Sequence, residues 1–325
     1  MTAAPVTPAL ADADPIGTPW FLARRRFRKN ILAVVGGILV ALILLACFAS
    51  LPWSLPRYAD QQQLRYTYHA PSAQFPLGTD RLGRDLLARF LLGGAISLTI
   101  GLVSAAIAVL IGTSVGLISG YVGGRLDALL MRIVDVVYGL PYILLVILMR
   151  VALVAPMQTF LMHPDSSGKS HWLDGSAAGQ WANIVVLLVG IGSVSWLTMA
   201  RVVRGQVLSL RDQPFVEAAR AMGFGNRRIL LGHILPNLVG PILVYATLTV
   251  PQAILSESFL SFLGLGIQAP LPSWGNLVSD GTDALNPIMI RWWLITWPCI
   301  GLSVTLLCLN FLGDGLRDAL DPKSH

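Results

Sequence analysis

Few residues of this chain could catalyse a reaction or hold a metal ion. Only two glutamates occur in the sequence, Glu217 and Glu257. The five histidines stand singly, without a partner at metal-ligand spacing, and the pattern HExxH is absent. The three cysteines lie in apolar runs without a CxxC pair, which is typical of buried thiols. We therefore expect no catalytic residue, no metal site and no cofactor, which argues against an intramembrane enzyme.

The segment SGKS at 167–170 invites comparison with a phosphate-binding loop. The full pattern GxxxxGK[ST] would need a glycine at the position of His163. No strand pattern precedes the segment and no helix signal follows it. The chain is therefore expected to bind no nucleotide, so active transport would need energy from elsewhere.

The polar stretch 213–237 interrupts an apolar second half and indicates contact with a soluble partner. Pro214 suits the first position of a helix, Glu217 suits its first turn, and Gly223 can end it in the left-handed conformation. A helix should therefore cover 214–222, with Asn226 capping a second one. The spacing i, i+3, i+4, i+7 predicts one buried face, made of Phe215, Ala218, Ala219 and Met222. Such a short helix is marginal alone in water and needs a partner.

The elements that position this stretch are membrane helices. The chain is 54% hydrophobic and 12% charged, far below the roughly 25% charge of soluble domains, so an all-α polytopic membrane protein is expected. Apolar runs predict six spans, at about 31–50, 93–119, 127–149, 183–203, 238–263 and 292–312. The net charge is +6, but no basic face interleaved with aromatic residues emerges, so nucleic acid is not an expected partner.

The spans divide the chain into four parts. These are a cytoplasmic tail at 1–30, the first helix with an outer loop at 31–92, a core at 93–313 that contains a cytoplasmic loop at 204–237, and a cytoplasmic tail at 314–325. Residues 1–23 should be disordered. Fourteen Lys and Arg residues then lie inside and eight outside, Arg150 among the latter, in agreement with the positive-inside rule. We expect a multi-pass membrane protein with both termini in the cytoplasm.

Polar and small residues inside the spans have mainly structural interpretations. Small residues recur at spacings of mostly four between 93 and 120, which predicts close helix packing. Arg132 and Asp135 are one turn apart and should form an ion pair. Glu257 is the one deep acidic residue. With its neighbours Ser256 and Ser258 it is either a hydrogen-bonded structural carboxylate or part of a gate or substrate path.

The spaced residues of 213–237 resemble a known pattern. Glu217-Ala218-Ala219, Gly223 and Leu235-Pro236 follow the order of the EAA loop of ABC-importer permeases. The ending HILPN at 233–237 is typical of the dipeptide and oligopeptide branch. The segments 76–85, 261–276 and 313–322 resemble the same branch, so the resemblance covers nearly all of 25–322. Most residues of 76–85 should still do no more than form solvated turns. The alternative for 213–237 is an ordinary amphipathic cytoplasmic loop.

The resemblance implies the fold of a type I ABC importer permease for dipeptides or oligopeptides. Such a permease lies in the lipid of the bacterial inner membrane and pairs with a second related permease. It docks two cytoplasmic ATPase subunits and receives substrate from an extracytoplasmic binding protein. The residues that the resemblance assigns to the ATPase contact are Phe215, Glu217, Ala218, Ala219, Arg220, Met222, Gly223, Arg227, Leu235 and Pro236. The substrate stays open among dipeptides, longer peptides, nickel and haem. A secondary carrier or channel for a small solute is the alternative function, although no internal repeat supports it.

Overall fold

The structure, a computed structural model, describes residues 19–60, 64–162, 173–285 and 289–320, so the SGKS segment lies outside it. The described residues form helices and connecting turns, with no strand among them. The helices are α1 (Pro19–Lys29), α2 (Ile31–Ala49), α3 (Leu51–Asp60), η1 (Leu64–Tyr66), α4 (Leu86–Val122), α5 (Gly124–Tyr138), α6 (Tyr142–Met162), α7 (Gly175–Arg211), α8 (Pro214–Ala221), α9 (Asn226–Ile229), η2 (Leu230–Ile234), α10 (Leu235–Phe262), α11 (Trp274–Asp283) and α12 (Trp293–Leu320). Among the described residues, six runs are long and apolar enough to cross a membrane: α2, α4, α6, α7, the run from α9 through α10, and α12. The expected all-α fold with six spans is confirmed.

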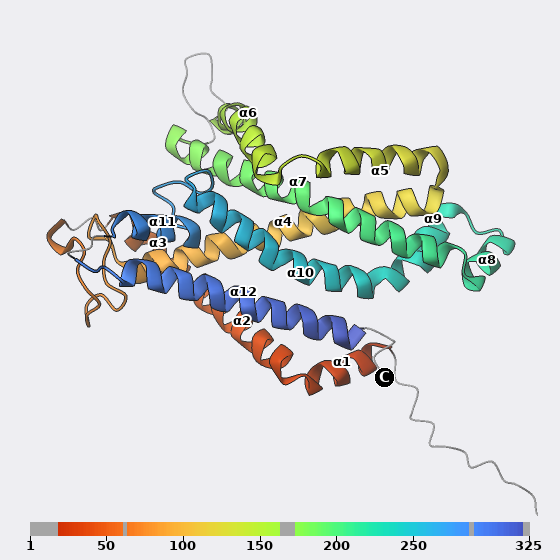
Figure 1. The fold of residues 1–325 in the computed structure, drawn as a ribbon, viewed down its shortest axis with the longest axis horizontal. Coiled ribbons are helices and arrows are strands. Elements are labelled where there is room, and N and C mark those ends of the chain that lie inside the picture. The colour runs from red at the N-terminus through yellow and green to blue at the C-terminus, as the bar shows by residue number, and fades with distance from the viewer. Residues whose placement is uncertain (1–18, 61–63, 163–172, 286–288, 321–325) are drawn as a thin grey trace, which may run out of the picture.

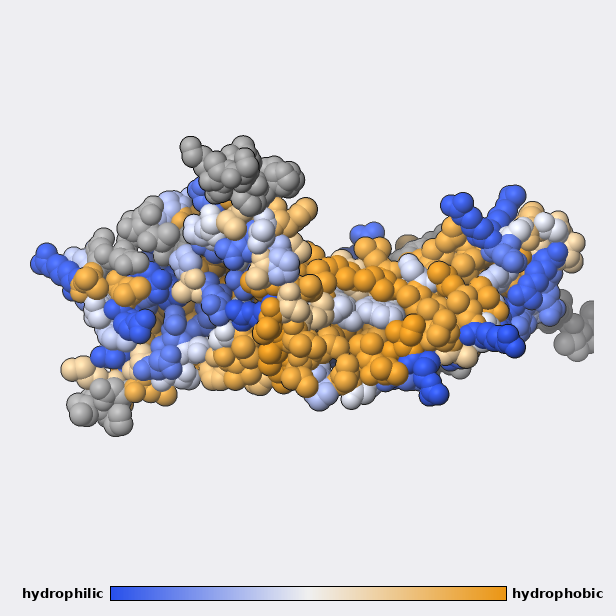
Figure 2. All heavy atoms as spheres, turned by 90° about the horizontal axis from the view of Figure 1, so that it is seen from above, coloured by the Kyte–Doolittle hydropathy of each residue, from blue (hydrophilic) through white to orange (hydrophobic). Residues whose placement is uncertain are grey.

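Most of the long helices run along one axis of the molecule (Figure 1). α8 and α9 lie at one end, called the α8 end below, and α3 and α11 lie at the opposite α11 end. α1 and the last turns of α12 also lie toward the α8 end. Between the two ends the surface is an apolar band, and hydrophilic side chains gather at both ends (Figure 2). This distribution fits a bilayer with an aqueous face on either side.

The small residues of α4 bring it close to α7 and α10. A Cβ atom on Gly112 would lie 2.6 Å from the Cβ of Met199, and one on Gly116 would lie 2.7 Å from the carbonyl oxygen of Ala200. Gly101 approaches α10 just as closely. A side chain at any of these positions would push the helices apart, so the predicted packing role of this face is confirmed.

The third predicted span is broken into two helices. Residues 139–141 separate α5 from α6, so a single helix over 127–149 is wrong. Pro141 lacks a backbone N–H and disfavours the helical conformation at Leu140, which explains the break. The run long and apolar enough to cross the membrane is α6, and Arg150, expected in an outer loop, lies within it.

The first and last helices, α1 and α12, cover residues that the sequence does not suggest to be helical. Residues 19–23 belong to α1, so the disordered tail expected there is wrong over these positions. α12 continues to Leu320 instead of ending near 312, because Gly315 lets it pack directly on Ala33 of α2. Residues 314–320, expected to belong to a short C-terminal tail, are therefore part of α12.

Side-chain caps set two further helix starts. α4 begins before position 93 because the Asp85 side chain accepts a hydrogen bond from the Leu87 N–H at 2.9 Å. α11, which no expectation covers, begins with a capping box. In it the Ser273 N–H donates to Asn276 Oδ1 at 2.8 Å, and the Asn276 N–H donates to Ser273 Oγ at 3.3 Å.

Candidate functional site

α8 is the predicted short helix of the polar stretch. It ends where Gly223 adopts a φ of +79°. The Gly223 N–H donates to the carbonyl of Arg220 at 2.9 Å, and the Phe224 N–H donates to the carbonyl of Ala219 at 3.1 Å. This pair of bonds satisfies the last carbonyls of the helix and requires a positive φ at the glycine. The predicted helix and its glycine-ended stop are confirmed.

The four apolar residues predicted to share one face of α8 lie in different surroundings. Val216 and Ala219 are buried in a cluster with side chains of α7, α9, η2 and α10. Phe215 is 40% exposed, Met222 is 64% exposed, and Ala218 is exposed as well. Ala219 therefore packs within the chain, because the helix is turned so that Val216 fills the space beside α7. Phe215, Ala218 and Met222 form an outward face.

The segment after α8 enters the fifth span through an irregular turn. α9 is followed by η2, one turn of π-helix, and then by α10. The wider turn precedes Pro236, whose ring would clash with the carbonyl four residues earlier in a regular helix. Asn226 does not cap α9, so that prediction is wrong. Gly225 occupies the capping position, and Asn226 Oδ1 accepts a hydrogen bond from the Tyr121 hydroxyl at 3.0 Å.

The other residues of the predicted contact set lie around this face. Glu217, Arg220 and Arg227 are exposed. Leu235 is partly buried against the same cluster as Ala219, and Pro236 is exposed on the first turn of α10. The α8 end thus presents exposed apolar side chains with charges of both signs nearby, an arrangement typical of protein interfaces.

Ion pairs hold α5 against α7 near the α8 end. Asp127 accepts two hydrogen bonds from Arg204, at 2.5 Å from Nε and 2.6 Å from Nη2. These bonds lower the pKa of the Asp127 carboxyl. Asp135 pairs with Arg201 at 2.7 Å, so the predicted pair with Arg132 is wrong. α7 brings the Arg201 guanidinium beside that carboxylate, and no local spacing in the sequence indicates it.

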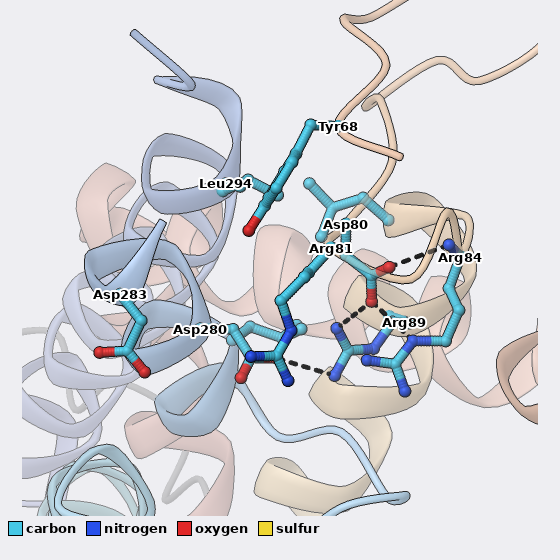
Figure 3. Close-up of a pocket in the computed structure, with 10 residues that line it drawn as sticks. Tyr68, Asp80, Arg81, Arg84, Arg89, Asp280, Asp283 and Leu294 are labelled. Atoms are coloured by element: carbon cyan, nitrogen blue, oxygen red, sulfur yellow. Dashed lines mark hydrogen bonds and ion pairs between the residues drawn. The ribbon is translucent and has the colours of Figure 1, made fainter. Parts of the chain in front are cut away.

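A buried ion cluster lies at the α11 end (Figure 3). The Asp80 carboxylate accepts hydrogen bonds from Arg84 Nε at 2.6 Å and from Arg89 Nη1 at 2.7 Å. Arg89 Nη2 reaches Asp280 of α11 at 3.1 Å. Asp80 and Arg89 are each 3% exposed. The expected solvated turns at 76–85 are therefore wrong for these charges.

The segment 76–85 is covered because it turns back onto α12. Gly78 has a φ of +85°, and a Cβ there would lie 2.8 Å from the Trp293 ring. Trp293 Nε1 donates to the carbonyl of Thr79 at 3.4 Å. Burial also raises the pKa of Asp85, the cap of α4. The sequence signal for this cluster is an arginine, Arg89, in the first turn of an apolar helix, where a charge needs a partner.

Two family models match the chain. The model described as binding-protein-dependent transport system inner membrane component matches residues 112–325. The chain belongs to this permease family. A second model, the N-terminal TM domain of oligopeptide transport permease C, matches residues 18–71.

Relatives match the permease along nearly its whole length. The oligopeptide transport system permease protein OppC of Haemophilus influenzae is 44% identical over 308 residues, which cover 94% of this chain and 89% of the relative. The dipeptide transport system permease protein DppC of Bacillus subtilis is 41% identical over 93% and 85% of the two chains. The glutathione transport system permease protein GsiD of Pectobacterium atrosepticum is 37% identical over 97% and 95%. The resemblance to ABC-importer permeases of the peptide branch is confirmed.

A solved structure also aligns with the permease. It is the inward-facing MetNI methionine ABC transporter, with a TM-score of 0.49 and 21% identity over 72% of this chain and 96% of that chain.

Glu257 of the permease is fully buried in α10 and richly hydrogen-bonded. Ser261 Oγ donates to Glu257 Oε1 at 2.6 Å, and Ser258 Oγ donates to Oε2 at 3.2 Å. The Ser97 and Ser273 side chains also lie close to the carboxylate. Four hydroxyls from α4, α10 and the cap of α11 thus converge on one acidic group, as the structural interpretation expects.

The same hydroxyls receive backbone N–H groups of the segment around α11. Ser261 Oγ accepts from the Ile267 N–H at 2.9 Å, and Ser97 Oγ accepts from the Trp274 N–H at 3.3 Å. Ser256 is not among the partners of the carboxylate. The network ties α11 to α4 and α10. A gating role stays a prediction.

The sequence GTSVG at 112–116 matches the GxSxG pattern of nucleophilic serines. In the permease it lies inside α4, where Ser114 Oγ donates to the carbonyl of Leu110 at 2.7 Å. That pattern needs a sharp strand-to-helix turn to present the serine. The match is therefore part of a helix interior, where Gly112 and Gly116 serve packing.

Proposed function

We propose that this permease is a subunit of an ATP-driven importer of dipeptides or oligopeptides. It forms the membrane pathway with a second homologous permease, docks cytoplasmic ATPase subunits at α8, and receives substrate from an extracytoplasmic binding protein. The observation that carries the proposal is the outward face of α8, Phe215, Ala218 and Met222, on a helix whose opposite side is anchored in the chain. Relatives named for oligopeptide and dipeptide transport support the substrate class.

The anchoring explains how so short a helix can transmit a motion. α8 has eight residues, too few to be stable alone in water. Val216 and Ala219 fix it in a cluster that includes Val207 of α7 and Leu238 of α10. A partner that moves α8 therefore acts on the ends of two spans. Hydrolysis of ATP then belongs to the partner, and the permease itself is no enzyme.

The exposed surface of the spans supports a second permease and lipid as neighbours. Val146 is the one buried residue of α6. Large apolar side chains on the same helix are open, among them Leu148 at 67% and Val151 at 77% exposure. A helix with so much exposed apolar surface needs lipid or another membrane subunit around it.

The charges and the positions of α1 and α12 support an orientation in the membrane. α1, with its basic residues, lies toward the α8 end together with the last turns of α12 (Figure 1). With the positive-inside rule, both termini and α8 lie in the cytoplasm. Cysteines introduced at Ser176 and Ser209, which are exposed near opposite ends of α7, should react with an impermeant thiol reagent from opposite sides of the membrane. Reaction from one side only would refute this topology.

The central test is reconstitution. The permease with its second permease, ATPases and binding protein should import a tripeptide into proteoliposomes only when ATP is present. The isolated permease should hydrolyse no ATP. Uptake that persists without the ATPases and follows an ion gradient would support the secondary carrier instead.

A further inference from the structure

An arginine with no acidic partner among the described residues lies inside α6. Arg150 is the one charged residue in the 21 residues of α6. Its Nη1 donates to the carbonyl of Gly264 at 3.3 Å, and no carboxylate of the described residues forms an ion pair with it. A charge in a membrane helix is costly and commonly marks a substrate path or a water-filled cavity. One neutral carbonyl leaves most of its five N–H donors available.

A cavity with both polar and apolar lining residues lies near this arginine. It has a volume of about 310 Å³ and lies between the first turns of α7 and the segment 267–271. Gln180, Asn183 and Gln268 contribute amide groups to its lining. Gln268 Nε2 donates to the carbonyl of Gly264 at 2.8 Å, so the Arg150 guanidinium and a lining amide share one oxygen. The guanidinium therefore stands at the edge of the cavity.

A second polar residue of α6 points the same way. Gln158 lies eight residues, about two turns, after Arg150 on α6. Its Nε2 donates to the carbonyl of Gly175 at 3.3 Å, in the first turn of α7, and Gly175 lines the cavity. α6 thus brings one cation to a carbonyl shared with the lining residue Gln268, and one amide to the lining residue Gly175.

We propose that this cavity binds a short peptide in transit, with Arg150 holding the C-terminal carboxylate and the amides of Gln180, Asn183 and Gln268 contacting the peptide backbone. The inference rests on the proposed function and names a recognition site for its substrate class. Side-chain amides both donate and accept, as peptide groups require, and a guanidinium matches a carboxylate with two parallel bonds. The volume falls within the range of small-molecule sites. Such a site recognises groups common to all peptides and ignores their side chains.

A paired-peptide protection assay tests the site. Ser176 lines the cavity and is exposed, so Ser176→Cys in a cysteine-free permease reports access to it. In proteoliposomes that hold the complete transporter, the labelling rate is measured with a small water-soluble thiol reagent. Trialanine should slow labelling about tenfold more than its C-terminal amide does, as expected for loss of a charge-assisted hydrogen bond. Arg150→Gln should remove the difference, and the exposed Arg81→Gln should leave it unchanged.

The outcomes separate this inference from the proposed function. If trialanine and its C-terminal amide protect Ser176→Cys equally in the permease that keeps Arg150, the carboxylate site is overturned. This comparison holds even if Arg150→Gln fails to assemble. Protection that depends on anionic lipid and not on peptide would assign Arg150 to lipid phosphates and also overturn it. ATP-dependent import of trialanine without any protection would refute the site alone. Absence of import by the complete unmodified transporter would refute the proposed function.

Discussion

Two adjacent alanines of α8 should respond to the same substitution in different ways. Ala219 is 1% exposed and packs in the cluster that contains Val207 and Ile229, whereas Ala218 is exposed. Adding the leucine side chain at 219 overpacks a filled space, at a cost of about 1–3 kcal/mol. That energy corresponds to a roughly 5- to 150-fold shift in the equilibrium that keeps α8 docked on its own chain. Ala218→Leu should change the stability of the permease alone by no more than about 0.5 kcal/mol.

The two substitutions should also weaken binding of the ATPase for different reasons. Ala218→Leu places a bulky group on the outward face, so it should block binding of the ATPase while the permease stays intact. Ala219→Leu should weaken the same binding indirectly, because α8 loses its anchored position. The measurements are the thermal unfolding midpoint of the detergent-purified permease and the amount of ATPase that it retains in a pull-down.

A matched control lies on the same helix. Glu217→Gln removes an exposed charge without adding bulk, so it should leave thermal unfolding unchanged. The reasoning fails if Ala218→Leu retains the ATPase at the unmodified level. It also fails if Ala219→Leu unfolds at the same temperature as the unmodified permease.

Three further predictions concern buried or paired charges. Glu257→Ala should lower the unfolding temperature sharply, since each buried hydroxyl left without its acceptor costs about 1–3 kcal/mol. Loss of transport with unchanged stability would instead favour a gate. Arg89→Gln should destabilise the permease by about 3–5 kcal/mol in a thermal or denaturant assay, and the exposed Arg81→Gln by far less; equal effects would contradict the buried cluster. Asp127→Asn should lower stability at neutral pH, because the lowered pKa of Asp127 means that its charged form is favoured by folding. This contribution is present above the ordinary pKa of 3.8 and lost as the pH falls below it, so the two unfolding temperatures should converge in acid; a gap that persists at low pH would refute the assignment to Arg204.

The helix α8 could be predicted from the sequence because its signals are local. Pro214 and Gly223 act through their own backbone preferences, which do not depend on the rest of the fold. Which side of the helix would face inward could not be predicted in the same way. Phe215 is larger than Val216, yet Val216 is buried, because the positions of α7 and α10 decide which side chain meets the core.

The broken third span shows where composition misleads. Residues 127–149 are apolar enough to be counted as one span, although Gly139 and Pro141 carried the local signal for a break. The start of α11 had a signal too, since Ser273 and Asn276 stand at capping-box spacing. Asn276 takes the place of the usual glutamate or glutamine, so the box is easily overlooked.

The charge cluster at the α11 end had no complete signal in the sequence. Asp80 and Arg84 are four residues apart, but Asp280 lies 191 residues beyond Arg89. Only the fold brings that last carboxylate to the arginine. When the sequence identifies no partner, a charged residue in a polar loop is expected to face solvent. This is why the expectation for 76–85 fails.

α7 is the element through which the two ends of the molecule can be coupled. Its 37 residues give a length of about 55 Å. Val207, near its last turn, packs in the cluster that anchors α8, and Gln180 and Asn183, in its first turns, line the cavity beside Arg150. Along its length it lies directly on α4, where glycines leave no room for the two helices to approach further. Tightly packed helices move as a unit more readily than they deform. A displacement of α8 should therefore reach the cavity as a tilt of the α4 and α7 pair, and the protection of Ser176→Cys by trialanine should change when the ATPases bind ATP.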